Sequence, residues 1–156
     1  MRASRRWLSD SPSETIKTGR IISRLLKPGM VVALVGELGS GKTTLVKGLA
    51  LGLGVRDARE VRSPTFVIFH IYKGRIPLYH FDLYRLSRPS DLEEIGLDEF
   101  FSDLNAISVI EWADRAPEIV KEANLKIELS RLSETRRAIR IYQSGPSKKR
   151  SKYSCC

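Results

Sequence analysis

Residues 30–44 have the sequence MVVALVGELGSGKTT, and this stretch decides the fold. Its first six residues are all apolar and include three valines, which is typical of a strand buried on both faces of a parallel sheet. In residues 36–43, two glycines then flank four residues and are followed by Lys42 and Thr43, which is the pattern of a phosphate-binding loop. Leucines at helical spacing follow in 42–53. A buried strand, a glycine-rich turn and a helix in this order predict a nucleotide-binding α/β domain.

The phosphate loop predicts ATP and Mg²⁺ as ligands. Its glycines let main-chain N–H groups converge on phosphate oxygens, and the start of the helix adds a favourable potential for anions. Lys42 is expected to reach the β- and γ-phosphates, and the Thr43 hydroxyl to bind Mg²⁺.

Two acidic residues end strand-like runs and are the candidates for a further metal ligand and for water activation. Glu111 follows the apolar run 106–110, as an acidic metal-binding motif would. Asp82 ends the run 76–82 and shares a strand face with His80. A solvated strand-end charge remains the alternative for Glu111, and a turn cap remains the alternative for Asp82.

Other polar and aromatic residues leave two interpretations open. Thr65 lies about twenty residues after the phosphate loop, where a hydroxyl can sense the γ-phosphate, although it can equally satisfy its own loop. His70 and His80 are interpreted as hydrogen-bonded structural residues, since no partner has metal-site spacing. Trp112 either packs over the site or fills the core, and we expect core filling.

The remaining elements alternate between strands and helices. Ser11 is the expected N-cap of a helix that continues to about Leu26. The other expected elements are a hairpin formed by 65–72 and 76–82, a helical region over 90–101, strands over 106–110, 125–129 and 138–142, and a helix over 117–123. This order predicts a largely parallel sheet that one antiparallel hairpin interrupts.

Composition and charge bound the class of protein. The chain has 156 residues, enough for one domain over 1–142, and residues 143–156 are expected to form a disordered tail. No run of 18 apolar residues occurs, so a cytoplasmic protein is expected. The only two cysteines are adjacent at the C-terminus and cannot bridge a core.

The net charge of +9 is unevenly distributed. Residues 1–27 carry 7 basic and 2 acidic side chains, 28–130 carry 12 and 15, and 131–156 carry 8 and 1. The basic ends suit either a nucleic-acid contact or a solubilising role. The stretch 91–103 contains acidic but no basic residues, which suits either a protein-partner surface or a solvated amphipathic helix.

Several strings together resemble the TsaE family, small bacterial ATPases of tRNA modification. The strings are Gly36 to Thr44, Ser63-Pro64-Thr65-Phe66, Tyr79-His80-Phe81-Asp82-Leu83-Tyr84-Arg85-Leu86, Glu93-Glu94-Ile95-Gly96-Leu97 and Ile110-Glu111-Trp112. The resemblance covers about residues 11–142 and implies a three-layer P-loop NTPase fold. It also implies a role in forming threonylcarbamoyladenosine at position 37 of tRNAs that read ANN codons, with the proteins TsaB and TsaD as partners.

The resemblance also implies roles for individual residues. Thr43 and Glu111 resemble the family's Mg²⁺ ligands, Asp82 an acid near the γ-phosphate, and Thr65 a switch hydroxyl. The implied nucleotide contacts are Gly36, Glu37, Leu38, Gly39, Ser40, Gly41, Lys42, Thr43 and Thr44, with Ser11, Thr15 and Arg137 on the adenine side. The implied catalytic set is Lys42, Asp82, Glu111 and Thr65.

Two other functions fit the same residues. A small P-loop kinase is possible because a phosphate loop does not identify the acceptor of the phosphoryl group. A basic RNA-binding module with a vestigial nucleotide site would use the charged ends and retain the loop only as structure.

Overall fold

The computed structural model describes residues 2–64, 68–86, 88 and 90–144. Within these residues seven strands form one sheet in the spatial order β1-β7-β6-β2-β5-β4-β3. In chain order the strands are β1 Arg2–Ser9, β2 Val31–Val35, β3 Phe69–Tyr72, β4 Leu78–Asp82, β5 Ile107–Glu111, β6 Leu125–Arg131 and β7 Arg137–Gln143. The α-helices are α1 Pro12–Ile22, α2 Lys42–Gly52, α3 Ser90–Ile95, α4 Leu97–Phe101 and α5 Pro117–Glu122. Short 3₁₀ turns cover Ser23–Leu25, Ala58–Glu60 and Ala113–Arg115.

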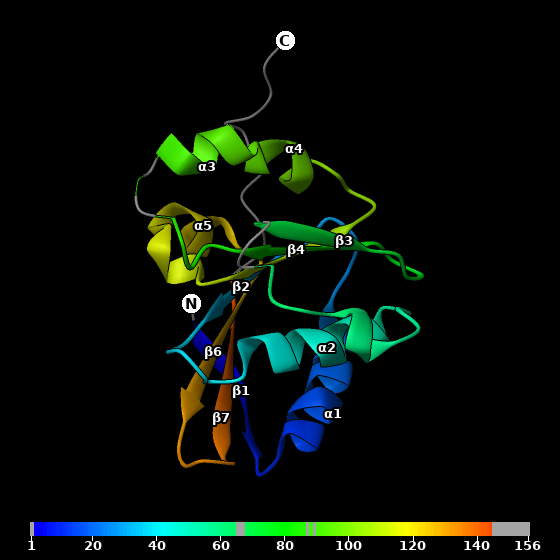
Figure 1. The fold of residues 1–156 in the computed structure, drawn as a ribbon, viewed down its shortest axis with the longest axis vertical. Helices are drawn as coiled ribbons and strands as arrows, with labels where there is room; N and C mark the ends of the chain where they lie inside the picture. Colours follow the sequence, from blue (N-terminus) through cyan, green and yellow to red (C-terminus); the bar gives the residue numbers. More distant parts are fainter. Residues whose placement is uncertain (1, 65–67, 87, 89, 145–156) are drawn as a thin grey trace.

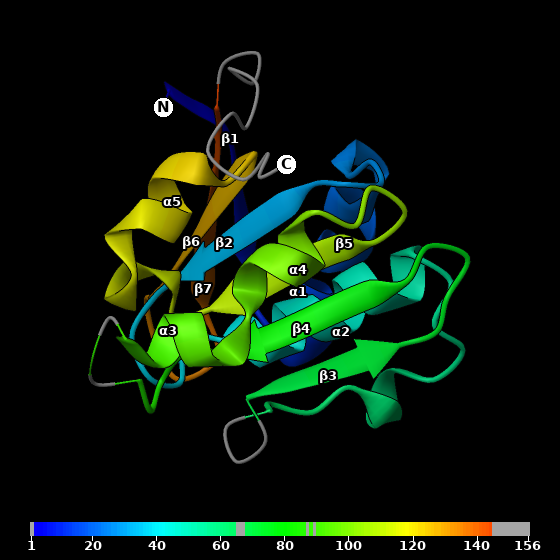
Figure 2. The ribbon, with the colours of Figure 1, turned by 90° about the horizontal axis from the view of Figure 1, so that it is seen from above.

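Helices cover both faces of the central strands, which gives three layers (Figures 1 and 2). On one face, α1 and α2 pack together and bury a core that includes Leu45, Leu49 and Val109. On the other face, α5 and the α3–α4 region cover a second core that includes Phe81 and Ile110. The predicted three-layer α/β fold is confirmed.

The four strands β6, β2, β5 and β4 run parallel, as the apolar runs indicated. The expectation of a mostly parallel sheet with one hairpin is only partly correct, because β1–β7, β6–β7 and β3–β4 are all antiparallel. Half of the six pairings among the described strands are therefore antiparallel. The physical reason lies between β6 and β7, where residues 132–136 are too few for the crossover that a parallel pair needs.

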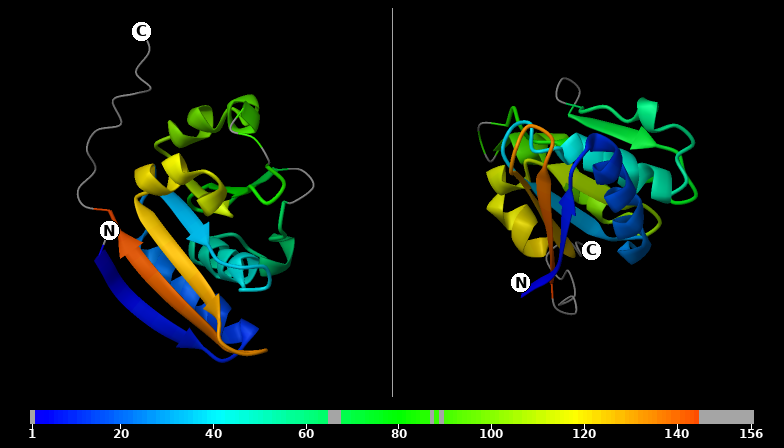
Figure 3. Two further views of the ribbon diagram at one scale, coloured as in Figure 1. Left: turned by 90° about the vertical axis from the view of Figure 1, so that its left-hand side faces the viewer. Right: turned by 90° about the horizontal axis from the view of Figure 1, so that it is seen from below.

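Strand β1 was not predicted. It pairs along its length with β7 and forms the outer edge of the sheet (Figure 3). Among the described side chains of the strand, Arg5, Arg6 and Leu8 are exposed and Trp7 packs against the core, so the strand has little apolar signal of its own. The strand is therefore held in the sheet mainly by backbone pairing with β7, because its side chains add little apolar burial.

Most helix boundaries agree with the sequence. Ser11 caps α1 as predicted, because its hydroxyl accepts a hydrogen bond from the Glu14 N–H at 3.2 Å. The α-helix ends at Ile22 and only a 3₁₀ turn continues toward Leu26. The helical region over 90–101 is divided into α3 and α4 at Gly96, which has a left-handed conformation.

The helices of the described residues include none that combines the length and apolar character needed to cross a bilayer. The predicted tail overlaps the end of β7 at Gln143, and its residues 145–156 lie outside the described part of the chain.

Candidate active site

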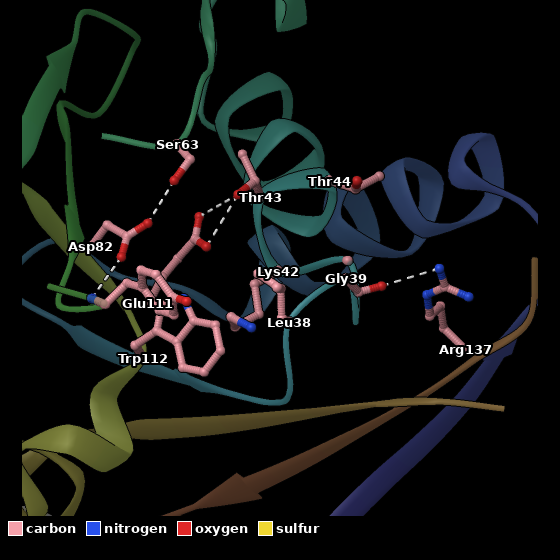
Figure 4. A pocket seen from close by; sticks show the side chains of 12 residues that line it. Leu38, Gly39, Lys42, Thr43, Thr44, Ser63, Asp82, Glu111, Trp112 and Arg137 are labelled. Atoms are coloured by element: carbon pink, nitrogen blue, oxygen red, sulfur yellow. Dashed lines mark hydrogen bonds between the residues drawn. The ribbon is translucent and has the colours of Figure 1, made fainter. Parts of the chain in front are cut away.

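A pocket of about 500 Å³ lies where β2, β5 and β4 end and α2 begins (Figure 4). Clefts at the carboxyl ends of parallel strands are the usual ligand sites of open α/β sheets. The pocket is lined by Leu38, Gly39, Gly41, Lys42, Thr43, Thr44, Ser63, Asp82, Tyr84, Glu111, Trp112 and Arg137.

The phosphate loop depends on glycine at two positions. Gly41 has φ +97° at the N-cap of α2, a backbone conformation that residues with a Cβ rarely adopt. A Cβ at Gly36 would lie 2.5 Å from the Leu129 carbonyl oxygen, so only glycine lets the loop approach β6 this closely. The loop therefore leads directly into the first turn of α2, and Gly41, Lys42, Thr43 and Thr44 all line the pocket. The first turn of an α-helix has N–H groups without intrahelical partners, which suits an anion.

Lys42 is buried within the loop that precedes it. Its Nζ donates hydrogen bonds to the carbonyl oxygens of Gly36 at 2.6 Å and Glu37 at 2.9 Å. The same nitrogen lies 3.8 Å from the ring centre of Trp112, a cation–π contact. Burial lowers the pKa of Lys42, and nearby carboxylates, Glu111 first among them, oppose that shift. The Lys42 amino group is thus held against the phosphate loop by two carbonyl oxygens and by the ring of Trp112.

Thr43 and Glu111 are brought together as predicted. The Thr43 hydroxyl lies 2.9 Å from Oε1 and 3.1 Å from Oε2 of Glu111, and Glu111 is only 2% exposed (Figure 4). The interpretation of Glu111 as a solvated strand-end charge is therefore wrong.

This pair suits Mg²⁺. A hydroxyl and a carboxylate converge in the pocket, and hard oxygen donors of this kind are what Mg²⁺ prefers. No cluster of three or more His, Cys, Asp or Glu side chains that could hold a metal occurs among the described residues. A magnesium ion that also contacts phosphates and water needs only one or two carboxylates, so the residues present fit it.

Asp82 lies beside Glu111, because the two residues are register partners at the ends of β4 and β5. Its Oδ2 accepts a hydrogen bond from the Ser63 hydroxyl at 2.5 Å, and its Oδ1 accepts one from the Tyr84 N–H at 2.8 Å. Asp82 therefore caps the turn after β4 and lines the pocket as well, so the two interpretations were not exclusive.

Three other predicted residues are not placed in the pocket. Thr65 falls outside the described residues. Thr15 is 2% exposed, and its hydroxyl lies 2.7 Å from the Ser9 hydroxyl, while Ser11 serves as the cap of α1. Neither Ser11 nor Thr15 is among the described residues that line the pocket, and their contact with adenine stays a prediction.

Arg137 is brought to the pocket from β7. Its Nη2 donates a hydrogen bond to the Gly39 carbonyl oxygen at 3.2 Å, so it holds the outer side of the phosphate loop. Gly36, Glu37 and Ser40 form part of the phosphate loop. They are not among the described residues that line the pocket.

Sequence reasoning missed several contacts. His80 is hydrogen-bonded, as expected, but its partner is Glu111 at 2.8 Å, which was not predicted. Ser63 binds Asp82 although Thr65 was the hydroxyl singled out. Trp112 packs partly on the core, yet its ring also lies over Lys42 and 4.9 Å from that of Tyr84, so it lines the site. The alternation of side chains along the strand predicted that His80 shares a face with Asp82. This was the one signal in the sequence that pointed to a place for His80 near the site.

Comparison with known proteins decides the family. Residues 9–139 match the family model described as threonylcarbamoyl adenosine biosynthesis protein TsaE. The chain belongs to the TsaE family.

Curated and solved members of the TsaE family agree over most of the chain. A protein of Treponema pallidum named tRNA threonylcarbamoyladenosine biosynthesis protein TsaE is 41% identical, over 87% of this chain and 98% of its own length. A Bacillus subtilis protein of the same name is 40% identical, over 90% of this chain and 86% of its own. The crystal structure of Bacillus subtilis YdiB superposes with a TM-score of 0.73 at 32% identity, covering 93% of this chain and 89% of that one.

Proposed function

We propose that this chain is a Mg²⁺-dependent ATPase that acts in forming threonylcarbamoyladenosine at position 37 of tRNAs that read ANN codons. The observation that carries the ATPase part is the convergence of Lys42, Thr43, Asp82 and Glu111 on one pocket beside a phosphate loop. Membership of the TsaE family, whose members are named for this biosynthesis, supports the tRNA part.

The residues of the loop would bind and orient the triphosphate. The N–H groups at the start of α2 would donate to phosphate oxygens, and Lys42 would exchange its two carbonyl partners for phosphate oxygens. Because Lys42 is buried and charged, a phosphate oxygen would satisfy it better than a neutral carbonyl oxygen does.

Glu111 and Asp82 would have different roles in the reaction. Thr43 and Glu111 would hold Mg²⁺, which when bound neutralises negative charge on the phosphate oxygens. Asp82 would orient the attacking water through its carboxylate, which Ser63 and the Tyr84 N–H fix in place.

The partners proposed are the proteins TsaB and TsaD, and the place of action is the cytoplasm. The transfer of the threonylcarbamoyl group would belong to a partner, because the residues that line the described pocket are those proposed to bind a triphosphate and Mg²⁺. The basic ends of the chain are proposed to contact tRNA phosphates directly.

Association with the partners tests the tRNA-modification role. Size-exclusion chromatography of the chain mixed with TsaB and TsaD of the same organism should show a complex whose amount changes between ATP and ADP. The Lys42→Ala variant should lose that nucleotide dependence. Absence of any complex with either nucleotide would contradict the proposed partners and leave a P-loop protein of another function, such as a kinase.

A further inference from the structure

The side chain of His80 contacts that of Glu111. It is fully buried, and its Nε2 lies 2.8 Å from Glu111 Oε1. It does not line the pocket, so it is not positioned to touch a nucleotide. Any role in the reaction would act through Glu111.

The register of the sheet explains this contact. His80 is the register partner of Val109, and Asp82 is the partner of Glu111, so His80 and Glu111 are diagonal neighbours on adjacent parallel strands. Alternation along each strand puts both side chains on the face covered by α2. Diagonal neighbours on one face lie within reach of long side chains.

Among the described residues, Glu111 has few hydrogen-bond donors for a buried carboxylate. Those that the structure gives it are the Thr43 hydroxyl and His80. In the function proposed above, the Thr43 hydroxyl turns its oxygen toward Mg²⁺. His80 is then the donor that still fixes the orientation of Glu111.

The hydrogen-bonding pattern specifies which ring nitrogen carries the hydrogen. An ionised carboxylate only accepts hydrogen bonds, so Nε2 must be the donor. The other ring nitrogen, Nδ1, is buried with no hydrogen-bond partner among the described residues. A hydrogen on Nδ1 would be a buried donor without an acceptor, which is unfavourable. We therefore expect the Nε2–H tautomer.

We propose that His80 is a positioning residue that holds Glu111 in the orientation needed to bind Mg²⁺. This inference rests on the proposed function, since it assigns His80 to the same metal site. Buried partners that orient a metal ligand in this way are worth about 10- to 100-fold in metal affinity.

The test measures metal binding rather than turnover. Mn²⁺ serves as the paramagnetic probe, and its dissociation constant is measured from water-proton relaxation in the presence of a non-hydrolysable ATP analogue. His80→Leu removes the donor, and His80→Gln keeps an N–H donor. The matched control is His70→Leu, because His70 is the register neighbour of His80 on β3 and has no contact with Glu111. Urea unfolding of each variant checks that it is folded.

The expected result is a dissociation constant raised about 10- to 100-fold in His80→Leu, largely recovered in His80→Gln and unchanged in His70→Leu. Affinity for the analogue without metal should be the same in all four proteins. Wild-type affinity in His80→Leu would overturn the inference and leave the proposed function intact. Equal losses in His80→Leu and His80→Gln would also overturn it, because packing rather than the hydrogen bond would then be responsible.

A second measurement needs neither metal nor nucleotide. Two-bond ¹⁵N–¹H correlation spectra of the wild-type chain should show His80 as the Nε2–H tautomer. The Nδ1–H tautomer would overturn the inference whatever the metal does. A wild-type chain that binds no Mn²⁺ with the analogue would overturn both this inference and the proposed metal site, which distinguishes that failure from a failure of His80 alone.

Discussion

Lys42 is the residue on which the binding of a phosphate depends most directly. Its buried ammonium group has loop carbonyl oxygens as partners, and exchanging them for phosphate oxygens gives charge-assisted hydrogen bonds. Lys42→Ala should weaken ATP binding about 10- to 100-fold, from the 1.5–3 kcal/mol typical of such bonds. Calorimetric titration measures it, with Lys47→Ala, on the same helix but away from the pocket, as the control. Full affinity in Lys42→Ala would contradict the assigned role.

Glu111 is expected to affect turnover more than nucleotide binding. Glu111→Gln keeps the size of the side chain and one accepting oxygen but removes the charge that a metal ion requires. Because metal assistance is worth several kcal/mol, the Mg²⁺-dependent rate should fall at least about 100-fold. ATP affinity without Mg²⁺ should stay close to that of the wild type. A variant whose rate still rises normally with Mg²⁺ would exclude Glu111 from the metal site.

Site residues that belong to a sequence motif were predictable. Site residues whose role depends on a partner from another segment were not. Lys42, Thr43 and Glu111 each follow a recognisable string, and the structure brings all three to the pocket. His80 and Ser63 act through partners on other segments, so their contacts depend on strand register and loop path. Those quantities are set by tertiary packing, which a single sequence does not display.

At the scale of elements, the close approach of α1 and α2 positions the phosphate loop. A Cβ on Gly48 of α2 would overlap the Ile16 carbonyl oxygen and lie 2.9 Å from the Gly19 Cα. Gly→Ala within a helix usually stabilises by about 1 kcal/mol, whereas overpacking costs about 1–3 kcal/mol. Gly48→Ala should therefore lower the free energy of unfolding.

Urea denaturation measures this change, and Lys47→Ala next to it should stay within about 0.5 kcal/mol of the wild type. A Gly48→Ala variant that is more stable than the wild type would show that the two helices have room to separate.

The burial of each element and its position in the sheet explain which elements could be predicted from the sequence. β2 is recognisable because its apolar run must be buried on both faces, and α2 because its leucines recur on one side. β1 is an edge strand, and edge strands carry charged residues that mask the strand pattern. The β6–β7 hairpin could have been predicted from its short connection, because a parallel crossover needs about a dozen residues or more.

At the scale of the whole molecule, the charge is divided between basic ends and an acidic body. Arg5 and Arg6 are exposed on β1, so they can be replaced without removing the strand that pairs with β7. Replacing both by Gln should weaken tRNA binding and reduce the slope of log affinity against log salt by about 1 to 2. Filter binding over a range of salt measures it. Replacing exposed Arg59 and Lys73 of the acidic body removes equal charge and should have less effect, and equal losses would contradict a specific role for β1.

Phosphate release from ATP by the full chain is the first measurement to make, because the pocket is proposed to hydrolyse ATP with the help of Mg²⁺. The rate is measured over a Mg²⁺ titration, alone and with TsaB and TsaD present, beside the Lys42→Ala and Glu111→Gln variants. We expect phosphate release that requires Mg²⁺ and is lost in both variants, as the proposed function requires. Phosphate release that is absent under every condition, or that is the same in the wild type and in Glu111→Gln, would contradict it.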